Sequence, residues 1–229
     1  MTDSPHFTSK TFAFLRDLAA NNRREWFQAN RERYEEHVRA PALHLIAGFG
    51  PHLDRISPHF EADPRPVGGS LFRLHRDTRF ARDKSPYKTT VGIQFRHEAG
   101  ASAHAPGFYL HVAPGASFAG AGAWHPDGPA LKRIRDAICA DPAAWKRAAH
   151  GRRFRARLEL GGDALARPPR GYDPEHPLVD DLRRKDFYGL AALDRKTVAG
   201  PHLTRELAAI YRAGAPLVGF LCKALGLPF

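Results

Sequence analysis

The chain has 229 residues, of which 43% are hydrophobic, and this length and composition suffice to bury the core of one compact domain. Lys and Arg outnumber Asp and Glu by 35 to 24, so the formal charge of +11 favours anionic partners, although a basic, Arg-rich proteome would give the same balance. The two cysteines, Cys139 and Cys222, form no CxxC motif, so neither a disulfide framework nor a thiolate metal site is expected.

The sequence contains no signal for export or membrane insertion. The N-terminal stretch MTDSPHFTSK lacks the basic and apolar regions of a secretory signal, and no apolar run reaches the roughly 18 to 20 residues that span a bilayer. The most apolar segment, Ala213–Phe229, is interrupted by Lys223 and by Gly and Pro, which is typical of a terminal core helix. We therefore expect a cytoplasmic protein without a membrane partner.

Helices are predicted over about residues 8–56. Apolar residues recur every three positions from Thr8 to Ala20, which places them on one helix face. Asn22 and Glu25 have the spacing of a capping box and predict a second helix that ends before Pro41. A third helix is predicted from Pro41 to about residue 56, and a Pro-rich loop follows it as far as residue 69.

The period changes to two over about residues 70–123. Leu71–Arg76, Thr90–Arg96 and Phe108–Ala113 each alternate apolar and polar residues and predict three β-strands, with a Gly-rich fourth at Phe118–Ala123. The connections, including the small-residue loop His97–Pro106, are too short for a covering helix, so antiparallel pairing is expected.

Helices and strands are mixed over about residues 127–229. Asp127 and Asp141, each followed by Pro, predict two helix starts. The remaining predicted elements are a strand at Phe154–Leu160, a helix at Leu178–Lys185, a strand at Phe187–Leu193, and a helix at Pro201–Leu225 that is broken near Pro216. The whole pattern predicts an α+β fold in residues 1–229, with an antiparallel sheet of at least four strands and N-terminal and C-terminal helices packed on one face.

The stretch Ser70–Lys88, SLFRLHRDTRFARDKSPYK, concentrates positive charge. It holds six cations, Arg73, Arg76, Arg79, Arg82, Lys84 and Lys88, but only two acids, Asp77 and Asp83. Arginines can grip a phosphate or carboxylate through paired hydrogen bonds, so the excess predicts an anion site. The alternative is a structural network in which nearby carboxylates satisfy the arginines.

Strand parity divides these segments between two faces. If Phe72, Leu74 and the apolar residues of the next two strands face the core, the opposite face carries Arg73, His75, Lys88, Thr90, Gln94, Tyr109 and His111. His111 and Asp77 are the candidate acid or base. The predicted ligand-binding residues are Arg73, Arg76, Arg79, Lys84, Tyr87, Lys88, Tyr109 and Trp124, although the GAGA segment before Trp124 favours a tight turn with the Trp in the core.

Other motifs argue against several enzyme classes. Ser85-Pro86-Tyr87-Lys88 fits SxxK, but the SDN and KTG elements that should accompany it are missing. The thirteen His form no HExxH motif or close ligand spacing, so no metal site is predicted. The chain lacks a Walker A loop, a GxGxxG turn and a GxSxG elbow, and no cofactor is predicted.

One family shares these residues. The pattern Arg73-x-x-Arg76-Asp77-x-Arg79-Phe80, followed by Asp83-Lys84 and Tyr87-Lys88, resembles the hallmark of a family of uncharacterised bacterial proteins, also found in fungi, called domain of unknown function 2461. The resemblance extends over nearly the whole chain, through FLRDLAANNRREWF, GFYLHVAPG, GAGAWHP, PPRGYDPEHP and LRRKDF. It implies no activity and no catalytic residues.

Three functional hypotheses follow from the residues. The first is a site for a small ligand that bears a phosphate or carboxylate, whether or not the protein is an enzyme. The second is a nucleic-acid-binding module, because aromatic residues lie near the cations. The third is a scaffold whose arginines are all paired internally. The sequence does not indicate an oligomeric state.

Overall fold

The structure, a computed structural model, describes residues 6–79, 81–100 and 105–229. Its centre is a six-stranded sheet in the order β1-β2-β3-β4-β6-β5, in which all neighbours are antiparallel. The strands are β1 (Phe60–Glu61), β2 (Val91–His97), β3 (Gly107–Val112), β4 (Ser117–Ala123), β5 (Glu159–Gly161) and β6 (Phe187–Leu193).

Helices occur in both the N-terminal and the C-terminal parts of the chain. The N-terminal helices are α1 (Ser9–Ala20), α2 (Arg24–Ala29), α3 (Arg31–Tyr34), the π-helix η1 (Glu35–Arg39) and α4 (Ala40–Asp54). The later helices are α5 (Gly128–Ala140), α6 (Pro142–His150), α7 (Arg152–Arg155), α8 (Val179–Leu182), α9 (Arg195–Val198) and α10 (Leu203–Leu225).

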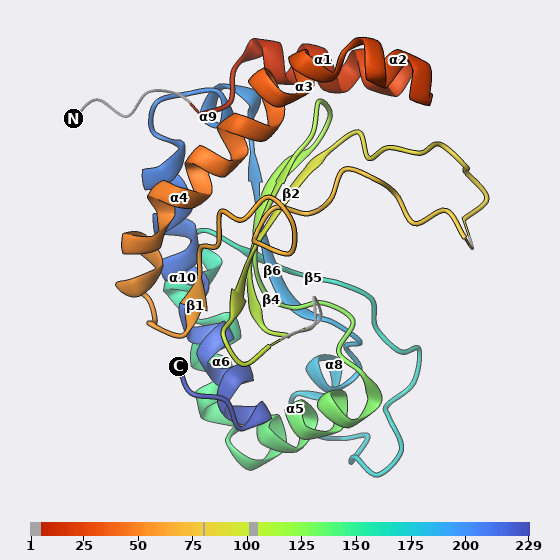
Figure 1. Ribbon diagram of the computed structural model, residues 1–229. Helices are drawn as coiled ribbons and strands as arrows, with labels where there is room; N and C mark the ends of the chain where they lie inside the picture. Colours follow the sequence, from red (N-terminus) through yellow and green to blue (C-terminus); the bar gives the residue numbers. More distant parts are fainter. Residues whose placement is uncertain (1–5, 80, 101–104) are drawn as a thin grey trace.

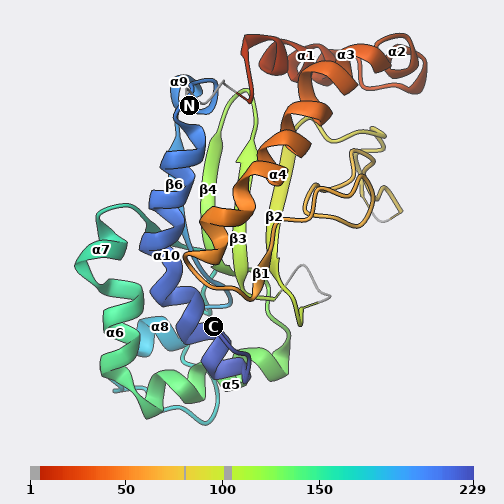
Figure 2. The same ribbon diagram turned by 60° about the vertical axis from the view of Figure 1, so that its left-hand side comes forward.

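The core lies between the sheet and the two longest helices, α4 and α10, which cover the same face (Figures 1 and 2). Phe49 of α4 stacks on Phe95 of β2 with ring centroids 4.9 Å apart. Tyr211 of α10 packs on Phe108 of β3 at 5.1 Å. The predicted α+β class, with N-terminal and C-terminal helices on one face of an antiparallel sheet, is confirmed.

Helix α10 is long and apolar enough to span a membrane, but 56% of its most apolar window is buried inside the protein. It packs here as a core helix. The predicted break near Pro216 is wrong, because α10 continues to Leu225 and ends at Gly226, whose φ of 72° forms a left-handed cap. At Gly214 a Cβ would lie 2.5 Å from Ala121 Cβ, so close packing on β4 holds the helix at this point.

Two N-terminal predictions are also wrong. Asn22 does not cap α2, whose N-cap residue is Arg23, because the Asn22 amide bonds the backbone of Tyr87 instead. The helix does not end before Pro41, since the π-turn η1 leads directly into α4 with Pro41 in its first turn. Proline lacks an N–H, and the carbonyl of His37, four residues before Pro41, accepts from the Thr11 hydroxyl instead, at 2.7 Å.

Two predicted strands are replaced by other structure. Leu71–Arg76 is irregular, and only the isolated bridges Leu71↔Ile93 and His75↔Tyr87 pair it with the returning chain. Phe154–Leu160 contains the end of α7 and only the start of β5. Phe154 turns inward at that helix because Gly189 has no side chain, and a Cβ there would lie 2.4 Å from the Phe154 ring.

We call residues 71–90 the arm. Figure 1 shows it as an irregular yellow excursion that leaves the sheet before β2. Phe80 of the family pattern lies outside the described residues, as do residues 101–104 of the predicted loop between β2 and β3.

Candidate functional site

The sheet face opposite α4 and α10, which we call the open face, carries a cavity of about 350 Å³. Strand register places alternate residues of four neighbouring strands on this face. Its larger lining side chains are Phe72 of the arm, Gln94, Tyr109, His111, Phe118, Trp124, Tyr188 and Leu190. The cavity is therefore largely apolar and aromatic.

Glycines on the open face leave the space for this cavity. Gly107, Gly120 and Gly122 line it in strands β3 and β4. Gly92 of β2 lies under two aromatic side chains, where a Cβ would be 2.6 Å from the Tyr109 hydroxyl and 3.0 Å from the Phe72 ring. Phe72, predicted to face the core, thus covers the open face and packs on Tyr109 with ring centroids 5.7 Å apart.

Tyr109 and His111 are the titratable pair inside the cavity. The Tyr109 hydroxyl lies 3.4 Å from His111 Nδ1, and the His111 ring stacks on Phe118 at 4.7 Å. Burial raises the pKa of Tyr109 to about 12 and lowers the pKa of His111 below its ordinary value. The pair is therefore a neutral phenol beside a neutral imidazole at neutral pH.

Trp124 forms one end of the cavity. Its side chain is 54% exposed, so the alternative of a Trp buried against the core is wrong. It comes two residues after Gly122 of β4, whose φ of 137° favours glycine, and it is among the residues that line the cavity. A large exposed indole at a cavity is suited to stacking on a ligand.

Two cations of the arm, Lys88 and Arg73, lie near each other and form what we call the cation pair, although neither is among the residues that line the cavity. Lys88 Nζ lies 5.3 Å from the centroid of the Phe72 ring. Burial, and then the charge of Arg73, lower the pKa of Lys88. Among the described residues, neither Lys88 nor Arg73 forms an ion pair with a carboxylate, although the charge of Arg73 contributes to lowering the pKa of Asp77.

The other predicted cations lie further along the arm and have partners there. Arg79 donates to both carboxylate oxygens of Asp77, at 3.0 and 2.7 Å, and these bonds lower the pKa of Asp77. Arg76 pairs with Asp83, while Lys84 Nζ donates to the Thr78 carbonyl at 2.8 Å. Asp77 is thus held as an ionised partner of Arg79, away from the cavity lining.

Tyr87 anchors the arm and does not line the cavity. It is 3% exposed and packs on Phe27 of α2 with ring centroids 4.4 Å apart. The Asn22 side chain bonds both its N–H and its carbonyl, at 3.1 and 2.9 Å. The structure therefore brings Tyr109, His111 and Trp124 together around the cavity, places Lys88 against the Phe72 ring that lines it, and gives Tyr87 a packing position.

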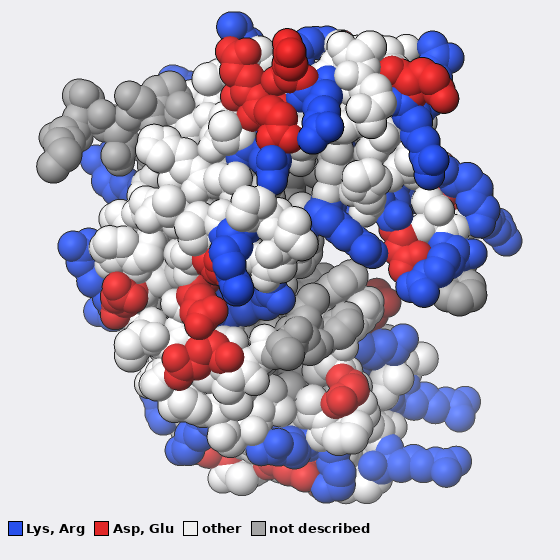
Figure 3. Space-filling model, in the orientation of Figure 1, with Lys and Arg blue, Asp and Glu red and all other residues white. Residues whose placement is uncertain are grey.

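The surface around the open face is basic. Figure 3 shows the molecule notched on its right-hand side, with Lys and Arg both above and below the notch. The arm forms the upper edge, and the segment 162–178 with its exposed Arg167 and Arg170 runs along the lower part of the same side (Figure 1). An anion approaching this side meets positive potential from two directions.

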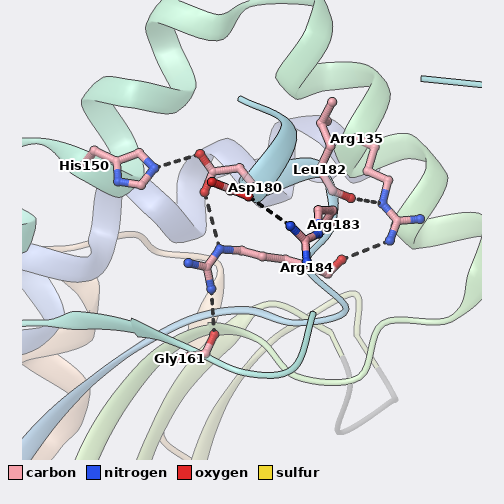
Figure 4. A network of polar contacts seen from close by, with 8 residues as sticks. Arg135, His150, Gly161, Asp180, Leu182, Arg183 and Arg184 are labelled. Atoms are coloured by element: carbon pink, nitrogen blue, oxygen red, sulfur yellow. Dashed lines mark hydrogen bonds and ion pairs between the residues drawn. The ribbon is translucent and has the colours of Figure 1, made fainter. Parts of the chain in front are cut away.

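A second arginine-rich region, the α8 network, contrasts with the cation pair (Figure 4). Buried Asp181 accepts from His150 Nε2 at 2.9 Å and Arg184 Nε at 3.3 Å. The other bonds of the network are Arg184 to the Gly161 carbonyl, Arg135 to the Leu182 and Arg184 carbonyls, and Arg183 to Asp180. Carbonyls and carboxylates of the protein accept the hydrogen bonds of these arginines. The network thereby joins the α8 segment to α5, α6 and β5.

The sequence analysis missed two residues beside Trp124. His125 has a φ of 47°, and its Nδ1 lies 3.1 Å from Oδ1 of buried Asp186. The two residues are 61 positions apart in the chain, and no short motif joins them. Within the described part of the chain, no group of His, Cys, Asp and Glu has the arrangement of a metal site.

Comparisons with known proteins identify a family and nothing closer. Residues 10–220 match the family model described as "Conserved hypothetical protein (DUF2461)". No curated protein and no solved structure matches the chain.

Proposed function

The chain belongs to the conserved hypothetical protein family DUF2461, and we propose that it binds a small anionic ligand with an apolar or aromatic body on the open face of its sheet. The body of the ligand occupies the cavity between Phe72, Tyr109 and Trp124. Its phosphate or carboxylate lies against Lys88 and Arg73.

The cation pair carries this proposal. Lys88 is half-buried and Arg73 is exposed, and like charges placed close together are unfavourable unless an anion joins them. The Lys88 ammonium lies over an aromatic ring that itself lines the cavity, so charge and apolar surface are presented to the same ligand. Pockets that bind small molecules commonly combine an apolar wall with a few convergent polar groups.

His111 supports the same site with a hydrogen bond. Burial keeps its imidazole neutral, so one ring nitrogen accepts while the other donates. Gln94 and the Tyr109 hydroxyl add polar groups at the cavity wall. These groups would orient the body of the ligand, whereas the cation pair would fix its charged end.

Binding measured by thermal shift and calorimetry tests the proposal. We expect phenyl phosphate and aryl carboxylates to raise Tm more than inorganic phosphate or acetate, because only the former fill the cavity. Lys88→Met should weaken binding about tenfold, in line with the loss of a charge-assisted hydrogen bond. Arg79→Ala is the matched control, since Arg79 is held by Asp77 on the arm and should leave affinity unchanged.

Equal affinity of wild type and Lys88→Met for every anion tested would overturn the proposal. Binding that Trp124→Ala and Lys88→Met both weaken, while Arg79→Ala does not, supports it. The Trp124 indole also gives a direct signal, because a ligand stacked on a 54% exposed Trp should quench its fluorescence.

Single-stranded nucleic acid is the second candidate, favoured by exposed Trp124 and by the cations on both edges of the notch (Figure 3). Binding would then fall steeply between about 50 and 200 mM salt, since several phosphates would be neutralised. A small ligand held by one cation pair would show a much weaker dependence.

A further inference from the structure

Three glycines, which we call the glycine floor, form the base of the cavity. Gly107 of β3 pairs with Gly122 of β4, and Gly120 lies two residues before Gly122 on the same face of the sheet. All three line the cavity. Because glycine has no side chain, the peptide groups of β3 and β4 are themselves the surface that a ligand meets here. Glycine inside a strand often marks such a close approach of a ligand.

The tyrosines on either side of the glycine floor lean away from it. The strand order places β3 and β6 on the two sides of β4. The hydroxyl of Tyr109 in β3 lies over Gly92 of β2, since a Cβ there would be 2.6 Å from it. The ring of Tyr188 in β6 lies over Gly161 of β5, where a Cβ would be 2.5 Å from Cε2. Both side chains thus extend over the outer neighbouring strand, and the cavity lies between them above β4.

Aromatic side chains also flank the glycine floor along β4. Phe118 lies two residues before Gly120, and its ring stacks on His111 with an interplanar angle of 11°. Exposed Trp124 follows the other end of β4. Phe118, His111 and Trp124 all line the cavity. The cavity is therefore a slot with a backbone base and aromatic rings around it.

The fold requires glycine at two positions of the floor but not at the third. A Cβ at Gly107 would lie 2.8 Å from a backbone oxygen of β2, and a Cβ at Gly122 would overlap a backbone oxygen of β6. At Gly120 the nearest atom among the described residues is Cδ2 of Leu190, at 3.2 Å. That methyl group is the end of a flexible side chain and can move by a few tenths of an ångström. Backbone packing therefore admits a side chain at position 120, and what glycine adds there is the open base of the cavity.

Building on the proposed function, we propose that the body of the ligand is a planar aromatic ring that lies face down on Gly120, and that this glycine determines the specificity of the site. A flat ring can bring all of its atoms to about 3.5–4.0 Å from the exposed peptide groups. Its rim then meets the aromatic side chains of Tyr109 and Tyr188. A saturated ring is puckered and touches a flat base through only some of its atoms.

The charged end of the ligand lies on the Tyr109 side of the slot. Phe72 packs on Tyr109 there with ring centroids 5.7 Å apart, and Lys88 Nζ lies 5.3 Å from the centroid of the Phe72 ring. A ring on Gly120 that directs its carboxylate or phosphate past Tyr109 therefore presents the anion to Lys88. The ligand class is an aryl carboxylate or an aryl phosphate.

Pairs of ligands that differ only in the saturation of the ring test this inference. Calorimetry would compare benzoate with cyclohexanecarboxylate, and phenyl phosphate with cyclohexyl phosphate. We expect the aromatic member of each pair to bind about tenfold more tightly, which is the upper end of what one aromatic contact contributes. Burial of apolar surface alone would not give this preference, because the cyclohexyl group has at least as much apolar surface as the phenyl group.

Gly120→Ala tests the role assigned to the glycine floor. The added Cβ should weaken binding of the aromatic ligands about tenfold, because it lifts the ring off the peptide groups, and should change binding of the saturated ligands little. The preference for flat rings is then lost. Gly115→Ala, in the turn between β3 and β4, meets no atom within 4 Å and is the matched control that should keep the preference. Thermal unfolding checks that both variants fold.

Proton NMR of the wild type provides a test that needs no variant. A ring that lies face down on the floor should shift the Gly120 amide and Hα resonances upfield through its ring current, whereas cyclohexanecarboxylate has no ring current. Benzoate that binds without moving these resonances would overturn the inference, and it decides the question if Gly120→Ala does not fold.

Failure of this inference and failure of the proposed function are distinguishable. If the aromatic and saturated anions bind the wild type equally, or if Gly120→Ala weakens both members of a pair alike, selection for a flat ring is overturned and the proposed function stands. If none of the four anions binds, both proposals are overturned.

Discussion

The α8 network and the cation pair are both rich in cationic side chains, yet they have opposite relations to the fold. In the α8 network, Arg184 is shared between the carboxylate of Asp181 and the carbonyl of Gly161. In the cation pair, Lys88 and Arg73 form no ion pair with a carboxylate in the described structure, and Lys88 lies over the Phe72 ring, which lines the cavity. The comparison shows that a dense run of Arg does not define a ligand site. We propose an anion site only where cations have no carboxylate partner, as at Lys88 and Arg73.

The largest effect on stability is expected in the α8 network. Asp181→Ala should lower the free energy of unfolding by about 2–3 kcal/mol, because it leaves His150 and Arg184 partly buried without their acceptor. Denaturant unfolding measures it. Asp180→Ala is the control on the same helix, since an 89% exposed carboxylate should contribute no more than about 0.5 kcal/mol. Equal effects of the two variants would show that the network is not structural.

An intermediate effect on stability is expected at Gly92, where the missing side chain leaves space on the open face. Gly92→Ala should cost about 1–3 kcal/mol, since its Cβ would displace the Tyr109 hydroxyl and the Phe72 ring. The same displacement should weaken anion binding, measured by calorimetry. Gly115→Ala meets no atom within 4 Å and should leave both stability and affinity nearly unchanged. A Gly92→Ala protein with unaltered affinity would place the ligand elsewhere.

The smallest effect on stability is expected at the cation pair itself. Lys88→Met should lie within about 1 kcal/mol of wild type and toward higher stability, because it removes a charge from beside Arg73 and keeps packing on Phe72. A loss of stability comparable to that of Asp181→Ala would show that Lys88 has an internal partner, and the contrast between the two regions would fail.

The same pair predicts a pH dependence. Since folding lowers the pKa of Lys88, the unfolded chain binds more protons between the folded pKa and the ordinary value of 10.5. Stability of the wild type relative to Lys88→Met should therefore rise as pH increases through that window and be lowest below it. Denaturant unfolding of both proteins between neutral pH and pH 10.5 measures the difference. A saturating anion should reduce it, because the anion favours the charged ammonium.

Strand parity was sufficient to predict the open face of two strands. Gln94, Tyr109 and His111 follow directly from alternation in β2 and β3, since each strand is long enough to keep its register. Alternation in Leu71–Arg76 misled for a physical reason. The arm makes only isolated bridges there, so the position of Phe72 is set by the space above Gly92 and not by the pleat of a sheet.

The partners of the charged groups could not be predicted from the sequence. Nothing local distinguishes Arg79, which binds an acid two residues away, from Arg73, which does not. His125 and Asp186 meet only because β4 and β6 are neighbours in the sheet although α5, α6, α7 and α8 separate them in the chain. Such contacts depend on topology, and periodicity carries no information on it.

The double hydrogen bond between Asn22 and Tyr87 joins parts of the chain 65 residues apart. It makes the order of the arm conditional on the docking of the N-terminal helices, because Tyr87 packs on Phe27 at the same place. We therefore expect the amides of the arm to exchange with solvent together with those of α1 and α2. A ligand that binds Lys88, which follows Tyr87, would therefore slow amide exchange in α1 and α2 without contacting either helix.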